Sequence, residues 1–291
     1  MGKCNSVAHY EVEGKGCVDL MEEDWDYLVV LDACRYDYFE DLYSDYLDGT
    51  LKWALSPASD TREWLEKVFR GKYGDTVYVS ANPHINSKGV DVGGNGFYAG
   101  EHFPEIVDVW GFGWDEKMKT VPPEAVNIAA VDTDLVHPDQ RLIIHYLQPH
   151  APYLSLFDYP SKSLLNYNDL DVVIHSLRNG VLQRAWQKLS FDSPFFTRMI
   201  WKIKRALSKN SVVRPIDFEL KKVGRDGVLK AYADTLRSVL KGIKGLLKHL
   251  SGKIVITADH GELLGEKNEW GHHPHHHVPQ LLEVPYFETS A

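Results

Sequence analysis

Several apolar, strand-like runs of this 291-residue chain end abruptly in a carboxylate or an imidazole. The clearest is Lys253 to Glu262, K-I-V-I-T-A-D-H-G-E, in which apolar and β-branched residues lead into Asp259 and His260. Such a run is typical of a strand buried on both faces of a parallel sheet. In open α/β sheets, ligands bind outside the carboxyl ends of the strands. The sequence therefore predicts an α/β fold with polar side chains gathered at one edge of its sheet.

The same pattern occurs twice more along the chain. Trp25 to Leu31 is typical of a buried strand and leads into Asp32, and Arg141 to Leu147 is a strand candidate that runs on to His150. A carboxylate beside an imidazole is a common ligand pair for Zn²⁺, Mn²⁺ and similar ions. The alternative is that these residues only cap turns at strand exits, and a lone loop histidine is more often structural.

Hydroxyl groups occupy the turn that follows another short strand, Leu51 to Leu55. This turn, Ser56 to Leu65, reads S-P-A-S-D-T-R-E-W-L, and either Ser59 or Asp60 can cap a helix that runs to about Arg70. Hydroxyls at a helix N-terminus lie near free N–H donors and the positive end of the dipole, which makes an anion site. Simple capping is the alternative and requires no catalysis.

Charge and cysteine content limit the classes of partner and compartment. The net charge of −9 argues against nucleic acid as the partner of the whole chain. The three cysteines form no C-x-x-C pair and cannot all pair with one another, so we expect a reducing compartment. No apolar run reaches 18 residues and the N-terminus has no signal-peptide core, so we expect a cytoplasmic protein.

Residues 155–225 resemble an insertion, which we expect to be helical. Between Arg184 and Lys230 the chain carries 12 Lys or Arg against 4 Asp or Glu. Within this part, residues 195–209 place apolar side chains at helical spacing among basic ones. Such a helix can contact a membrane surface peripherally or bind an acidic partner, or its apolar face can pack on the domain. A further amphipathic helix is predicted from Asp226 to Leu250.

A histidine-rich run follows the last predicted strand. Five of the six residues from His272 to His277 are histidines, and the run is internal and interrupted by proline, so we interpret it as native. Five imidazoles cannot all bind one ion. His272 or His273, the two nearest the strand edge, are the expected participants in a site.

Taken together, these motifs resemble the alkaline phosphatase superfamily, which includes sulfatases, phosphoethanolamine transferases and nucleotide pyrophosphatases. The resemblance covers most of the chain, through Val29–Asp32, the Ser56–Thr61 turn, the H-x-P-Y of Pro149–Tyr153, and Thr257–Glu262. It implies a three-layer α/β/α sandwich around a mostly parallel sheet. It also implies a single domain over residues 1–291, interrupted by the helical insertion at about 155–225.

The resemblance implies a metal centre as well. Asp32, Asp259 and His260 would be ligands of a divalent ion, and Thr61 would be both a ligand and the nucleophile. Ser59 remains an alternative nucleophile, because spacing does not decide which hydroxyl faces the ion. We expect Zn²⁺, with Mn²⁺ or Ca²⁺ as alternatives. In the resembled enzymes the ion lowers the pKa of the hydroxyl and polarises the phosphoryl or sulfuryl oxygens.

Two histidines complete the implied site, and two departures from the family pattern qualify it. His150 and His272 would bind the transferring group or protonate the leaving group. The formylglycine sulfatase signature C-x-P-S-R is replaced by T-R-E-W-L at Thr61–Leu65, which offers no cysteine to oxidise. A second-metal pair, D-x-x-x-H, occurs at Asp171 and His175, but it lies in the insertion and fits a helix surface equally well. One metal site is expected, and a second is left open.

The implied function is a metal-dependent hydrolase or transferase that acts on phosphate esters through a covalent threonine intermediate. Its substrate would be a small-molecule, glycan-linked or lipid-linked phosphate ester. One alternative is a sulfatase that works without formylglycine. Another is a non-catalytic relative whose basic insertion binds an anionic glycan, lipid or protein partner.

Overall fold

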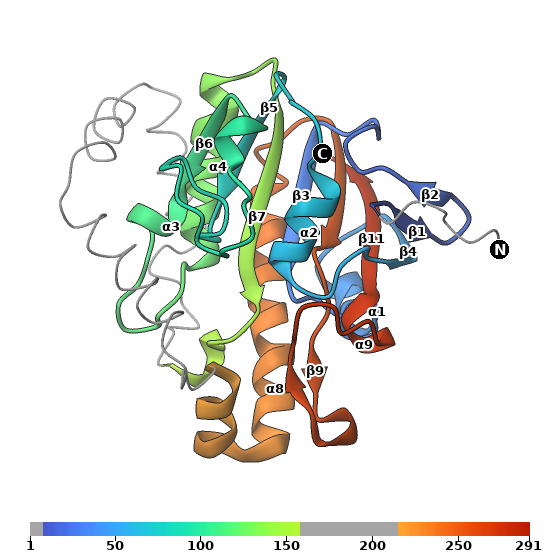
Figure 1. The fold of residues 1–291 in the computed structure, drawn as a ribbon, viewed down its shortest axis with the longest axis vertical. Coiled ribbons are helices and arrows are strands. Elements are labelled where there is room, and N and C mark those ends of the chain that lie inside the picture. The colour runs from blue at the N-terminus through green and yellow to red at the C-terminus, as the bar shows by residue number, and fades with distance from the viewer. Residues whose placement is uncertain (1–7, 158–214) are drawn as a thin grey trace.

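The computed structural model describes residues 8–157 and 215–291 of the chain, and a nine-stranded sheet forms its centre (Figure 1). The strand order across the sheet is β2-β1-β4-β11-β8-β3-β7-β5-β6. In chain order these strands are β1 (Tyr10–Val12), β2 (Gly16–Val18), β3 (Tyr27–Asp32), β4 (Thr50–Leu55), β5 (Thr76–Ser80), β6 (Glu105–Asp108), β7 (Arg141–Pro149), β8 (Lys253–Ala258) and β11 (Glu283–Ser290). A separate hairpin pairs β9 (Leu263–Leu264) with β10 (Trp270–Gly271).

The sheet is mostly parallel, as the sequence predicts. Strands β8, β3, β7, β5 and β6 form a continuous parallel block. Strand β11 pairs antiparallel with both β8 and β4, and β1 pairs antiparallel with both β4 and β2. Only β1 and β11 therefore run against the other strands of this sheet. The carboxyl ends of β3, β4, β5, β7 and β8 all lie at the same edge.

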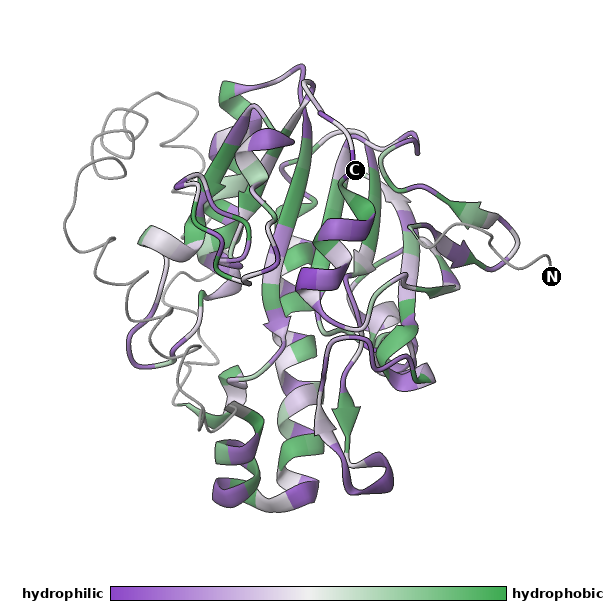
Figure 2. Ribbon diagram, viewed as in Figure 1, coloured by the Kyte–Doolittle hydropathy of each residue, from purple (hydrophilic) through white to green (hydrophobic). Residues whose placement is uncertain are grey.

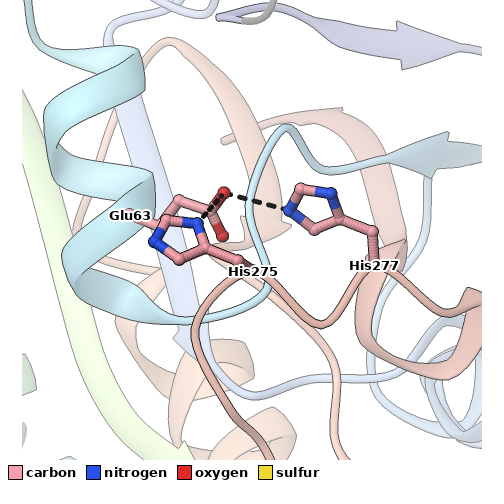
Figure 3. Close-up of side chains that lie close together, drawn as sticks. All are labelled: Glu63, His275 and His277. Carbon is pink, nitrogen blue, oxygen red and sulfur yellow. Dashed lines mark hydrogen bonds and ion pairs between the residues drawn. The ribbon is translucent and has the colours of Figure 1, made fainter.

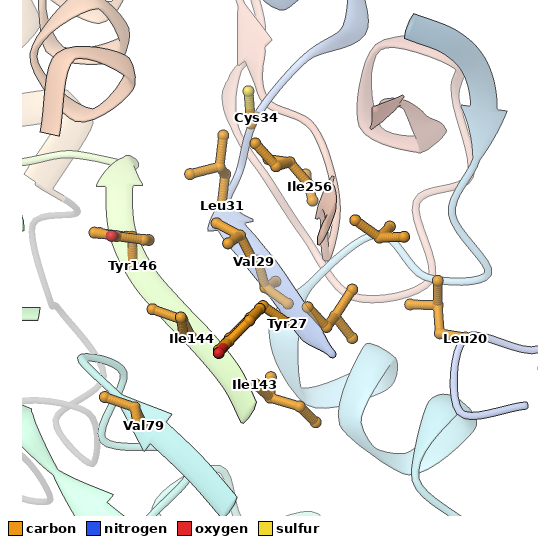
Figure 4. Close-up of a cluster of buried hydrophobic side chains, with 14 of the residues drawn as sticks. Leu20, Tyr27, Val29, Leu31, Cys34, Val79, Ile143, Ile144, Tyr146 and Ile256 are labelled. Carbon is orange, nitrogen blue, oxygen red and sulfur yellow. The ribbon is translucent and has the colours of Figure 1, made fainter. Parts of the chain in front are cut away.

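The central strands form because their side chains are apolar on both faces. Every residue of β3 is buried, and Val29 pairs in register with Ile144 of β7 and Ile256 of β8. Figure 4 shows these side chains with Leu31 in the core, and in Figure 2 the central strands are largely hydrophobic. Each such buried aliphatic side chain contributes about 1.5–3 kcal/mol, so the core fixes the register of the strand ends.

The helices of the described residues are α1 (Tyr36–Leu42), α2 (Thr61–Val68), α3 (Val109–Phe112), α4 (Pro123–Val136), α8 (Pro215–Leu246) and α9 (Pro279–Leu282). Because side chains alternate along β7, His145 and Tyr146 point to opposite faces of the sheet. The ring of His145 contacts Trp64 of α2. Tyr146 donates a hydrogen bond to Asn127 of α4, which itself donates to the Gly242 carbonyl of α8. Helix α2 thus covers one face and α4 and α8 the other, which confirms the three-layer arrangement (Figure 1).

The sequence patterns miss two strands and misplace one helix boundary. Residues Tyr10–Val18 form β1 and β2, which no apolar run indicates. Helix α8 begins at Pro215 rather than Asp226, with a break at Gly224 where φ is 70°, so the last part of the expected insertion belongs to this helix. The rest of the insertion, including 195–209 and the Asp171–His175 pair, lies outside the described residues.

Candidate metal centre

Two neighbouring strands bring three predicted ligands together at one edge of the sheet. Asp32 is the last residue of β3, and Asp259 and His260 follow directly after β8, which pairs with β3 in parallel. All three side chains are buried. His260 Nε2 lies 3.8 Å from Asp32 Oδ1 and 3.6 Å from Asp259 Oδ2. Residues more than 200 positions apart in the sequence therefore form a compact cluster of two carboxylates and an imidazole.

A backbone contact fixes the orientation of the His260 ring. Its Nδ1 lies 2.7 Å from the carbonyl oxygen of Gly261. A carbonyl oxygen can only accept, so Nδ1 carries the proton and Nε2 keeps its lone pair. Nε2 is the nitrogen that faces the two carboxylates. This backbone hydrogen bond thus prepares the ring as a ligand, as commonly occurs for histidines that bind metals.

The hydroxyl of Thr61 completes this cluster. Thr61 is the first residue of α2, and the Asp60 side chain caps the helix by accepting a hydrogen bond from the Glu63 N–H. Thr61 Oγ1 donates to Asp259 Oδ2 at 2.6 Å and lies 3.4 Å from His260 Nε2. A helix N-terminus favours negative charge, so this position stabilises an ionised hydroxyl or a bound anion.

The alternative hydroxyl, Ser59, has different partners. Ser59 Oγ donates at 3.0 Å to Glu63 Oε2 and lies 3.1 Å from the carbonyl oxygen of His273. It also accepts a hydrogen bond from the backbone N–H of His276. Ser59 therefore joins the turn before α2 to the histidine-rich loop, whereas Thr61 contacts the carboxylate cluster.

Neighbouring groups hold the two carboxylates in place. Asn82, just beyond the end of β5, donates to Asp32 Oδ2 at 2.9 Å. Ala33 has a positive φ of 60°, which is costly for a residue with a Cβ, and its N–H donates to Asp259 Oδ1 at 3.1 Å. The His260 N–H donates to the same oxygen at 2.8 Å. The strained turn after β3 thus connects the end of that strand to Asp259.

A second buried imidazole, His145 of β7, faces the same carboxylates. Its Nε2 lies 4.0 Å from Asp259 Oδ2, and its Nδ1 lies 2.9 Å from the hydroxyl of Tyr78. Burial lowers the pKa of His145 to about 4, although the Asp259 carboxylate opposes this. His145, Asp32 and Asp259 can each present a ligand atom within 4.8 Å of the others. His145 is therefore neutral at pH 7 and adds a nitrogen donor to the cluster.

The depressed pKa of His145 predicts a pH dependence of stability. In the unfolded chain a histidine titrates near 6.5, so the unfolded state takes up more protons than the folded state between about pH 6.5 and 4. The free energy of unfolding of the metal-free protein should fall as the pH falls through this window. His145→Gln should reduce that fall by roughly 3 kcal/mol at pH 4, as measured by denaturant titration. An unchanged pH dependence in this variant would contradict the assignment.

His150 and His272 lie beside the cluster. The ring of His272 is 4.3 Å from that of His260 and 5.2 Å from that of His150, measured between centroids. His272 Nδ1 lies 3.0 Å from the buried carboxylate of Glu262, which orients the ring. Burial lowers the pKa of His150. It is His272, and not His273, whose ring contacts His260.

The donor set fits a divalent ion. Asp32 Oδ1 and His145 Nε2 are buried and have no hydrogen-bond partner among the described residues, although such atoms are nearly always satisfied. Burial and the neighbouring Asp259 carboxylate raise the pKa of Asp32 well above its ordinary value. A cation between the carboxylates would remove that repulsion and satisfy both atoms. Oxygen and imidazole donors without thiolate suit Zn²⁺ or Mn²⁺.

Three features of this site were not predicted from the sequence. They are the nitrogen donor His145, the hydrogen bond from Asn82 to Asp32, and the contact by which Glu262 orients His272. A histidine inside the apolar run L-I-I-H-Y-L was a signal, because a buried imidazole requires polar partners. Asn82 comes shortly after the buried strand β5, just as Asp32 lies at the end of the buried strand β3. Glu262 ends the D-H-G-E run, but nothing in its spacing indicated a contact with His272.

Comparisons with known proteins give only structural similarities. No family model and no curated protein matches the sequence. The C-terminal periplasmic domain of phosphoethanolamine transferase EptC from Campylobacter jejuni is 15% identical with a TM-score of 0.48, over 91% of this chain and 78% of that one. The soluble domain of lipooligosaccharide phosphoethanolamine transferase A from Neisseria meningitidis is 12% identical with a TM-score of 0.49, over 90% and 75%. The periplasmic domain of EcEptC from Escherichia coli in complex with Zn is 10% identical with a TM-score of 0.44, over 98% and 76%.

The first two of these structures are domains of phosphoethanolamine transferases, one of the groups that the sequence motifs resemble. At this level of similarity the comparisons bear on the fold alone, so any functional assignment rests on the residues of this chain.

The cytoplasmic location expected from the sequence is wrong. Cys17 is disulfide-bonded, whereas Cys34 is a free, buried thiol. Disulfides persist mainly in oxidising compartments, so the cysteine content does not indicate a reducing one. Within residues 8–157 and 215–291, no helix is both long and apolar enough to cross a bilayer.

Proposed function

We propose that this protein is a metal-dependent hydrolase or transferase of phosphate esters, with Thr61 as its nucleophile. The observation that carries the proposal is the position of the Thr61 hydroxyl at the N-terminus of α2. It lies 2.6 Å from Asp259 Oδ2 and 3.4 Å from His260 Nε2, within a buried set of metal donors. A hydroxyl that contacts both a carboxylate and a metal-ligand imidazole is placed for activation as a nucleophile.

Asp32, Asp259 and His260 would hold the ion, with Thr61 as a further ligand and His145 as an additional nitrogen donor. A divalent ion bound there would act as a Lewis acid that favours the ionised hydroxyl and polarises the phosphoryl oxygens. Zn²⁺ is the ion we propose, because the set combines imidazole nitrogens with carboxylate oxygens. Asp259 also accepts the hydrogen bond of the Thr61 hydroxyl, so it can receive the proton as that oxygen attacks.

The proposed reaction has two displacements at phosphorus. Thr61 Oγ1 attacks, a bond forms between it and phosphorus, and the bond from phosphorus to the leaving oxygen breaks. His272, held by Glu262 at 3.0 Å, is positioned to give a proton to the leaving oxygen, and His150 to donate a hydrogen bond to the phosphoryl group. Water or an acceptor alcohol then attacks phosphorus and gives its proton to His272, the bond from phosphorus to Thr61 Oγ1 breaks, and that oxygen takes its proton back from Asp259. Hydrolysis and transfer differ only in this second nucleophile.

We propose a phosphate ester of a small-molecule, glycan or lipid alcohol as the substrate. We also propose that residues 1–291 form one domain, because the nine-stranded sheet contains both β1, the first described strand, and β11, the last. A sulfate ester is the alternative substrate, because it would meet the same donors. A comparison of phosphate and sulfate esters of the same alcohol tests the choice between them.

Metal removal tests the proposal directly. Chelation followed by gel filtration should lower the turnover of an activated phosphate ester at least about 100-fold, and one equivalent of Zn²⁺ should restore it. The matched sulfate ester should be turned over far more slowly at the same metal content. Full activity of the chelated protein would contradict metal dependence. A protein that neither retains a divalent ion nor turns over any ester would instead be a non-catalytic binding protein.

A further inference from the structure

The histidine-rich loop forms a second cluster of potential ligands around Glu63. His275 Nδ1 lies 3.2 Å from Glu63 Oε1, and His277 Nε2 lies 3.0 Å from the same oxygen (Figure 3). The three residues can each present a ligand atom within 4.8 Å of the others. The Glu63 side chain is only 3% exposed, whereas His275 and His277 are 78% and 46% exposed. Two solvent-accessible imidazoles therefore converge on one buried carboxylate.

This cluster shares no residue with the centre formed by Asp32, Thr61, Asp259 and His260. Glu63 lies two residues after Thr61 in α2, and the two histidines come from the loop before α9. An imidazole pair spaced as His-x-His, joined by one carboxylate, supplies three protein ligands of the kind that Zn²⁺ prefers and leaves a position for water. Hard cations such as Ca²⁺ and Mg²⁺ prefer sites made only of oxygen.

The carboxylate of Glu63 is held ready to bind a cation. Hydrogen bonds from Lys67 and from both the N–H and the hydroxyl of Ser59 hold it in place. Oε2 accepts from the Ser59 N–H at 2.9 Å and from its hydroxyl at 3.0 Å, which fixes the group and leaves Oε1 towards the histidines.

Lys67 lowers the Zn²⁺ affinity that we expect for this site. Its ammonium lies 2.7 Å from Glu63 Oε1, the oxygen that both histidines approach. A nearby positive charge repels a metal ion, so this site should bind Zn²⁺ more weakly than the buried centre. Replacement of Lys67 by an uncharged residue should strengthen binding.

We infer that Glu63, His275 and His277 form a second, solvent-accessible Zn²⁺ site that fastens the histidine-rich loop to helix α2. The loop is already attached there by Ser59, which contacts the backbone of His273 and His276. Zinc would connect the segment that begins at His272 with the helix that begins at Thr61. Any effect of this ion on turnover rests on the proposed function, but its binding does not.

Zn²⁺ uptake by the metal-free full-length chain tests the inference. Wild type should bind two equivalents with different affinities by calorimetry. His275→Ala/His277→Ala should bind one, because the weaker event is lost. His276→Ala is the matched control, since its side chain lies 4.0 Å from Glu269 and not on Glu63, and it should retain both events. Lys67→Met should tighten the weaker event at least about tenfold relative to wild type.

Two results would overturn the inference. One is a weaker event of unchanged affinity in both His275→Ala/His277→Ala and Glu63→Gln, which would mean only adventitious binding by other histidines. The other is a single equivalent in wild type that the double variant also retains. Asp259→Ala separates this site from the proposed function, because it should abolish the tighter event and leave the weaker one. Two binding events without ester turnover would refute the proposed function and support the second site.

Discussion

Thr61→Ala is expected to lower kcat/KM for an activated phosphate ester by at least about 10⁴-fold, because it removes the proposed nucleophile. The side chain lies at the start of α2 and its hydroxyl contacts Asp259 and His260. Zn²⁺ binding should persist in the variant, since two carboxylates and an imidazole remain. Thr61→Ser should recover much of the activity, because it restores the hydroxyl. Steady-state kinetics with the metal-loaded protein measure all of these effects.

Ser59→Ala is the matched control for Thr61→Ala. Both variants delete one hydroxyl from the same turn, but Ser59 contacts Glu63 and the loop backbone instead of the carboxylate cluster. We expect Ser59→Ala to change kcat/KM by less than about tenfold and to lower stability by about 1–3 kcal/mol, because Glu63 loses a buried partner. If Ser59→Ala is inactive while Thr61→Ala is active, the nucleophile has been assigned to the wrong residue.

Asp32→Asn is expected to have opposite effects on zinc binding and on the stability of the metal-free protein. In the metal-free protein, burial and Asp259 raise the pKa of Asp32, so an ionised Asp32 is unfavourable and stability is lost as the pH rises through that pKa. Asparagine carries no charge, and its amide oxygen can still accept from Asn82. The free energy of unfolding of the metal-free variant at pH 7 should rise by roughly 1–3 kcal/mol. Zinc affinity and turnover should fall at least about 10³-fold.

Asp132→Asn is the control for the stability effect of Asp32→Asn. Asp132 is a carboxylate on α4 whose pKa is raised by burial, but it is no part of the cluster. Its replacement should leave zinc affinity and turnover as in wild type. Wild-type zinc affinity in Asp32→Asn would refute its role as a ligand. A large loss of stability in metal-free Asp32→Asn would show that the two carboxylates do not repel one another.

The parts of the fold that sequence predicted are those that local pattern determines. Apolar runs mark β3, β7 and β8 because parallel strands are buried on both faces, and each run ends where the chain leaves the sheet. Asp32 and Asp259 could therefore be placed at one edge without a structure. A cap at Ser59 or Asp60 likewise indicated where α2 begins, and the structure shows that the cap is Asp60.

The parts that sequence did not predict depend on contacts between distant segments. Strand β11 contains Pro285, and proline argues against a central strand, yet β11 lies between β4 and β8. Pro285 has no N–H to donate, but its carbonyl oxygen accepts a hydrogen bond from the Thr257 hydroxyl. His145 was interpreted as one residue of a strand, because only the folded sheet shows that its ring faces Asp259. The choice between Thr61 and Ser59 needed the position of α2 relative to β8.

Strand β11 also determines when the centre can assemble during synthesis. Within the described sheet it alone joins the block that contains β4 to the block that contains β8. Thr61 follows β4 and Asp259 follows β8, so the distance between the hydroxyl and the carboxylate is set by a strand made after both. A nascent chain whose residues up to Glu262 have left the ribosome carries every proposed ligand of the buried centre, but the ligands are not yet arranged around it. Activity should therefore appear only once residues 283–290 have emerged and inserted between the two blocks.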